Sequence, residues 1–128
     1  MKFFISSLML AAMLLAAAPA AAQIAGDWHV NGKIDDRMFV LNCQFQPNDS
    51  GFGGICVEAP GGSAGTHAGK QHILTKGSVA GNQIGWSYPT SFMLMSFNVN
   101  FAGTMAGDSI TGTVTASGHS GPFTATRK

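Results

Sequence analysis

Glu58, His72 and Tyr88 are the side chains of this chain whose chemistry could support a reaction. A carboxyl group and an imidazole exchange protons near neutral pH, and a phenol orients a substrate through its hydroxyl group. Together they would serve as acid, base and orienting group of a cofactor-free isomerase or lyase. The alternative is structural, with His72 facing solvent and Glu58 in water at the end of a strand.

A second group of side chains is suited to binding rather than to reaction. Trp86 and Tyr88 lie two residues apart on one strand-like segment, and Met95 and Phe97 do so on the next. Alternation would turn all four side chains inward, where with Glu58 they could hold an apolar or aromatic ligand. They could equally fill a core, because a small barrel has room for side chains or for one small ligand.

The N-terminus has the pattern of a secretory signal peptide over residues 1–22. Lys2 is followed by an apolar stretch from Phe3 to Ala18 and by three alanines before Gln23. This pattern predicts cleavage after Ala22 and a periplasmic or secreted product, residues 23–128, that forms one domain. The apolar stretch is shorter than the roughly 20 residues of a spanning helix, so no integral membrane association is expected.

Charge and histidine spacing argue against two other classes of function. The formal net charge is +1, and the charged residues are scattered rather than clustered on one segment. A nucleic-acid partner is therefore not expected, because it would require a basic face. The four histidines, at positions 29, 67, 72 and 119, lack a metal-ligand spacing, and we expect neither a metal nor a cofactor.

Cys43 and Cys56 are the only cysteines. In an exported protein such a pair is more often a disulfide than a metal site or a reactive thiol. The segment 47–51, Pro-Asn-Asp-Ser-Gly, predicts a turn between them. The disulfide would therefore link two neighbouring antiparallel strands.

This pairing also places Glu58. If the two cysteines face each other, Leu41 opposes Glu58 and Phe45 opposes Gly54 on the same face. The apolar residues of that face mark it as the inner one, so Glu58 would point inward. A buried carboxyl group must be paired, protonated or functional.

Short alternating runs separated by turn residues predict an all-β domain with almost no helix after residue 22. We expect eight strands with short links, which favour a meander of sequential antiparallel neighbours over crossover connections. Glycines within the strand-like runs, at positions 85, 103 and 112, supply bends that favour a single antiparallel up-and-down β-barrel over a two-sheet sandwich. Their expected ranges are 26–34, 37–46, 53–59, 70–77, 82–89, 92–102, 108–117 and 121–127. The loop from Pro60 to Gly69 would lie over one end of the barrel.

Gly26-Asp27-Trp28 near the start and Arg127 near the end of the chain resemble a feature of the calycins, the group of lipocalins, avidins and small bacterial metalloproteinase inhibitors. In lipocalins a Gly-x-Trp motif closes one end of the barrel, and a basic residue of the last strand lies over the tryptophan ring. The resemblance implies a closed small-ligand barrel with Trp28 and Arg127 as structural residues. The chain lacks a second lipocalin motif and a C-terminal helix.

Three functions follow from these patterns. The first is an exported barrel that binds a small apolar or aromatic ligand. The second is the cofactor-free isomerase or lyase described above. The third is a periplasmic protein-binding or protease-inhibitor-like barrel that uses the loop from Pro60 to Gly69. Phe92, Leu94 and Val40 predict an exposed apolar patch, which would suit a protein partner or a homodimer.

Overall fold

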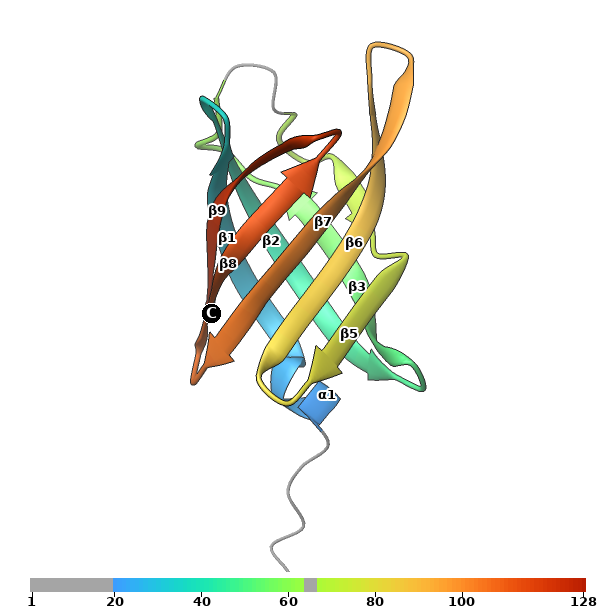
Figure 1. The fold of residues 1–128 in the computed structure, drawn as a ribbon, viewed down its shortest axis with the longest axis vertical. Helices are drawn as coiled ribbons and strands as arrows, with labels where there is room; N and C mark the ends of the chain where they lie inside the picture. The colour runs from blue at the N-terminus through green and yellow to red at the C-terminus, as the bar shows by residue number, and fades with distance from the viewer. Residues whose placement is uncertain (1–19, 64–66) are drawn as a thin grey trace, which may run out of the picture.

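The computed structural model describes residues 20–63 and 67–128, which form one curled antiparallel sheet preceded by a short helix, α1 (Ala20–Ile24) (Figure 1). Apart from its last residues, the expected signal peptide lies outside the described part. No helix within that part is long and apolar enough to cross a membrane. The predicted all-β character is confirmed.

The sheet contains nine strands, and turn residues separate most of them, as the alternating sequence predicts. They are β1 (Gly26–Ile34), β2 (Arg37–Asn48), β3 (Gly51–Glu58), β4 (Gln71–Ile73), β5 (Lys76–Ala80), β6 (Gln83–Phe92), β7 (Met95–Ala106), β8 (Ser109–Ala116) and β9 (His119–Arg127). The spatial order is β4-β3-β2-β1-β9-β8-β7-β6-β5. All pairs are antiparallel.

The prediction of eight strands is wrong because the segment expected as one strand over 70–77 pairs with two different neighbours. The amide of Leu74 donates a hydrogen bond to the carbonyl oxygen of Gly54 on β3, at 3.0 Å. The next amide, that of Thr75, donates to the carbonyl oxygen of Ser87 on β6, at 2.9 Å. The segment therefore leaves β3 and joins β6, which divides it into β4 and β5.

The same division makes the prediction of a closed barrel wrong. β4 and β5 are the two ends of the strand order, and no ladder joins these two strands in the described chain. The sheet curls into an open half-barrel. β3 and β5 nevertheless approach closely, because a methyl group on Gly77 would lie 2.3 Å from the carbonyl oxygen of Phe52.

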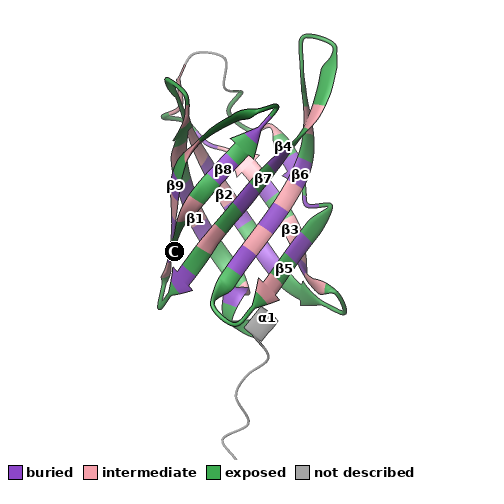
Figure 2. Cartoon of the chain, viewed as in Figure 1, coloured by how far each residue is buried: buried purple, intermediate pink, exposed green. Residues whose placement is uncertain are grey.

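Buried residues alternate with more exposed ones along the strands (Figure 2). This pattern arises because one side chain in two turns toward the concave face. The buried face has Trp86 at its centre. Its ring stacks on Phe101 with centroids 4.6 Å apart, and Phe45 and Phe123 contact it at 5.1 and 5.4 Å. These four rings form an aromatic core between opposite walls of the half-barrel.

Trp28 and Arg127 lie at the end of the half-barrel where α1 joins β1. They are directly paired between β1 and β9, and the guanidinium carbon lies 4.4 Å from the centre of the indole ring. The indole N–H donates to the carbonyl oxygen of Ile24, at 2.8 Å. The stacking expected of these two residues is therefore present, and the ring is fully buried. We call this the lower end, and the opposite end the upper end.

Candidate functional site

The register of β2 and β3 is the one predicted from the cysteines. Cys43 and Cys56 are paired and form a disulfide, which confirms the predicted bond. Leu41 pairs with Glu58 and Phe45 with Gly54, as expected. Glu58 therefore shares the side of the sheet occupied by the buried disulfide, which is the concave side.

Glu58, His72 and Tyr88 come together on the concave side, and we call them the polar cluster. Nε2 of His72 lies 3.3 Å from Oε2 of Glu58. The imidazole ring stacks on the phenol ring of Tyr88, with centroids 4.4 Å apart and an angle of 18° between the planes. The structure thus brings together the three residues singled out for acid–base chemistry.

Three separate elements hold these side chains. Glu58 ends β3, where two backbone hydrogen bonds hold it in place. Its amide donates to the carbonyl oxygen of Lys70, and the amide of Gly69 donates to the carbonyl oxygen of Glu58. His72 is on β4 directly opposite Cys56, so the two side chains share the concave face. Tyr88 lies on β6, whose alternation turns it inward. The cluster therefore spans the gap between the two edges of the open sheet.

Burial shifts the proton affinities of two members of the cluster. Removal from water lowers the pKa of His72 below 6.5, and its hydrogen bond with Glu58 and the charge of that carboxylate offset part of the effect. Burial raises the pKa of Tyr88 above 10.0, and the nearby Glu58 adds to the rise. At neutral pH the cluster thus contains a neutral phenol and an imidazole that resists protonation. A neutral imidazole that donates from Nε2 to a carboxylate keeps Nδ1 as an acceptor.

The cluster lies where the concave face becomes accessible. Along β6, Trp86 and Tyr88 are buried, Thr90 is half-buried and Phe92 is exposed. Along β7 the same gradient runs from the buried Phe101 through Val99 and the half-buried Phe97 to the exposed Met95. Side chains that point inward near the upper end are therefore open to contact from outside.

The predicted ligand-binding set is only partly assembled. Tyr88 and Glu58 are together, and Phe97 packs against the edge of the core. Met95 shares the orientation of Phe97 but lies beyond the core with 64% of its surface exposed, so it does not line an enclosed interior as expected. Trp86 is enclosed by three aromatic rings, yet its buried Nε1 has no hydrogen-bond partner among the residues that the structure describes.

Arg37 was not singled out from the sequence, although it contacts the exposed end of β6. Its guanidinium carbon lies 5.8 Å from the ring centre of Phe92. Arg37 has the same parity as Phe39 and Leu41 on β2, and this alternation is the signal that could have placed it on the concave side. The contact joins the first residue of β2 to the last residue of β6.

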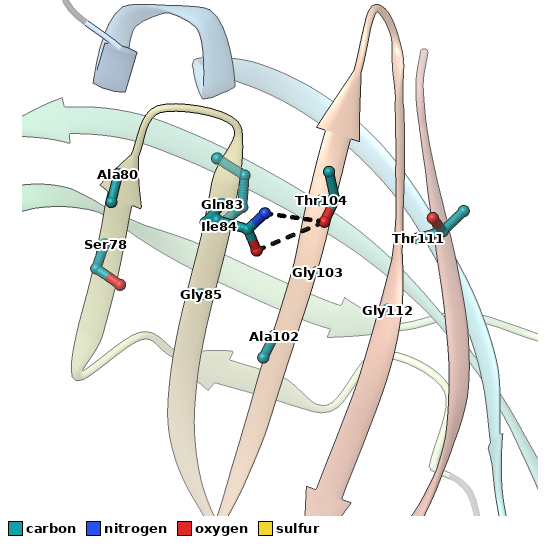
Figure 3. A pocket seen from close by; sticks show the side chains of 10 residues that line it. All are labelled: Ser78, Ala80, Gln83, Ile84, Gly85, Ala102, Gly103, Thr104, Thr111 and Gly112. Atoms are coloured by element: carbon teal, nitrogen blue, oxygen red, sulfur yellow. Dashed lines mark hydrogen bonds between the residues drawn. The ribbon is translucent and has the colours of Figure 1, made fainter.

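A hollow of about 410 Å³ lies on the outer side of β5–β8 (Figure 3). Small and polar side chains line it, among them Ser78, Ala102 and Thr111, and Gln83 is hydrogen-bonded to Thr104 beside it. It is separated from the polar cluster by the sheet itself, because these side chains are exposed while their neighbours in sequence are inward. It contains none of the predicted site residues.

Over residues 20–63 and 67–128, no three side chains of the metal-ligating kinds lie close enough together to hold a metal ion. Comparisons of the chain with protein-family models, with curated proteins and with solved structures find no match.

Proposed function

We propose that the chain is an exported binding protein for a small apolar or aromatic ligand that carries a hydrogen-bonding group. The ligand would lie at the upper end of the concave face, against the polar cluster. The observation that carries this proposal is His72, which is only 6% exposed and pairs with Glu58 while stacking on Tyr88. Burial of ionisable groups is costly, so such groups in an apolar interior often mark a functional site.

The surroundings of the cluster support this class of ligand. Phe39 and Phe97 are half-buried at the edge of the core, and both are available to an apolar or aromatic molecule. The cluster offers hydrogen-bonding groups to the polar part of the ligand. The N–H group of Trp86 adds a buried donor that a ligand acceptor would satisfy, if the rings around it move aside. In this proposal the concave face of the half-barrel takes the place of the closed interior that the resemblance to calycins implies.

Binding of anilinonaphthalene sulfonate, a fluorescent aromatic probe, tests the proposal. We expect His72→Leu and Phe97→Ala to weaken probe binding at least about tenfold, which corresponds to about 1.4 kcal/mol. Gln83→Ala, on the exposed outer face, is the matched control and should bind like the parent. Near-UV circular dichroism would verify that each variant keeps its tertiary structure. Equal probe binding by all folded variants would overturn the proposed site.

An acid–base enzyme is the second candidate, and the contact between His72 and Glu58 favours it. A carboxylate that orients an imidazole is a common arrangement of general bases. Glu58→Gln separates the two candidates. The change should abolish turnover in an enzyme that uses this pair, whereas a binding protein would only change its affinity for the ligand.

A further inference from the structure

The turn between β6 and β7 presents four consecutive apolar side chains, which we call the apolar tip. Phe92, Met93, Leu94 and Met95 are 50, 80, 106 and 64% exposed. The hairpin that carries them extends beyond the neighbouring turns at the upper end (Figures 1 and 2). Large apolar side chains concentrated at a protruding point commonly indicate an interaction surface.

The backbone of the tip is held in an unfavourable conformation for these residue types. Met93 and Leu94 have φ values of 49° and 68°, in the left-handed region that bulky residues rarely adopt. Two-residue hairpin turns of this kind favour Asn and Gly. The turn between β8 and β9 follows that preference more closely, with Ser117 and Gly118 at φ values of 50° and 79°. The apolar tip is therefore retained at a cost in stability, which is typical of functional turns.

The stem below the tip is regular and uncharged. The ladder of β6 and β7 continues without interruption to the pair Phe92 and Met95, so the tip is carried on a continuous two-stranded support. The sequence has no Asp, Glu, Lys, Arg or His between Gly77 and Gly107. The guanidinium group of Arg37 on β2 lies over the ring of Phe92, 5.8 Å from its centre, and brings a positive charge beside the tip.

We propose that the apolar tip inserts into the surface of a lipid bilayer. A neutral, convex group of apolar side chains can enter the boundary between headgroups and acyl chains, and the cation beside it suits a lipid phosphate. A second copy of the chain fits less well. At about 200 Å² for each large side chain, the tip exposes roughly 600 Å², whereas a stable protein interface buries about 800 Å² per partner.

A tryptophan probe at the tip tests insertion directly. Leu94→Trp would be mixed with phosphatidylcholine vesicles whose acyl chains carry bromine, using protein purified from cells that express the complete chain. We expect bromine quenching of this probe and a blue shift of its emission. Ile73→Trp is the matched control, because Ile73 is 67% exposed on β4 and is not part of the hairpin that carries the tip. Its emission should not change, and equal responses of both probes, or of neither, would overturn the proposal.

A second variant separates loss of binding from loss of folding. Met93→Asn combined with Leu94→Gly supplies the residues that the turn prefers, so it should unfold at a higher urea concentration than the parent. The same variant should lose at least about tenfold in flotation with vesicles that contain phosphatidylcholine and phosphatidylglycerol. Undiminished flotation would contradict insertion by the tip. A parent that dimerises without vesicles, when the variant does not, would assign the tip to a second copy instead.

Discussion

At the scale of single residues, the main feature is an imidazole held between a carboxylate and a phenol within an apolar wall. Burial of His72 disfavours its protonated form, and Glu58 restores part of the lost proton affinity. The sequence shows which side of the sheet these residues face, because alternation and the disulfide register determine it. Their mutual contact depends on where the chain leaves β3 after β4 and joins β6. No local pattern in the sequence shows that point.

The lowered pKa of His72 predicts a pH-dependent stability. Well above pH 6.5 the side chain is neutral in both states, and its contribution to stability is complete. As the pH falls below 6.5, the unfolded chain takes up a proton that the folded protein resists, so the free energy of unfolding decreases. One such group changes this free energy by at most about 1.4 kcal/mol per pH unit.

Urea unfolding at about pH 7.5 and about pH 5.5 would measure this dependence. His72→Gln should have a smaller decrease in unfolding free energy between these values than the parent. His67→Gln is the control, because His67 is exposed and should leave the decrease unchanged. Identical pH dependence of the parent and of His72→Gln would show that His72 does not contribute.

At the scale of elements, β3 shows how backbone contacts determine where the sheet can curl. Gly54 has a φ of 149°, and a methyl group on it would lie 1.9 Å from the carbonyl oxygen of Gln44 on β2. The same residue accepts the hydrogen bond of Leu74 as the chain leaves β3. Gly54 therefore lets the backbone of β2 approach closely on one side, and its carbonyl oxygen pairs with Leu74 on the other.

Gly54→Ala should destabilise the protein by at least about 2 kcal/mol, because it adds a backbone clash to an unfavourable φ. Gly53→Ala is a matched control one residue away. Its methyl group would meet only the side-chain nitrogen of Asn48, at 3.3 Å, so we expect a change below about 1 kcal/mol. Urea denaturation of both variants measures the difference. Similar stabilities of the two would contradict the role assigned to Gly54.

At the scale of the whole molecule, the sequence predicts most strands but not how the sheet ends. Alternation along 70–77 is the same whether a strand keeps one neighbour or changes to another, so the division at Leu74 could not be predicted. Parity likewise shows that Met95 has the orientation of Phe97, but not that the hairpin has passed beyond the core at that point. The disulfide was predictable because it depends on residue type and on the turn between the two cysteines. The contact of Trp28 with Arg127 was expected only from the resemblance to calycins.

The two ends of the described chain meet at the lower end, where the side chain of Arg127 contacts several segments. Its guanidinium group donates to the carbonyl oxygens of Gln23 and Ala25, and it also pairs with Asp108 on the turn between β7 and β8. These bonds, together with the contact with Trp28, link the first strand, the last strand and the segment before β1. Removing the side chain should therefore affect global stability rather than one local turn.

Arg127→Ala should lower the free energy of unfolding by about 2–4 kcal/mol, from lost charged hydrogen bonds and the lost cation–π contact. Arg127→Lys keeps the charge but cannot reproduce the geometry of the guanidinium bonds, so its loss should be intermediate. Urea denaturation followed by the fluorescence of the buried Trp28 and Trp86 would report both values. If Arg127→Ala changed stability by less than about 0.5 kcal/mol, the lower end would be held by β1–β9 pairing and burial of Trp28 alone.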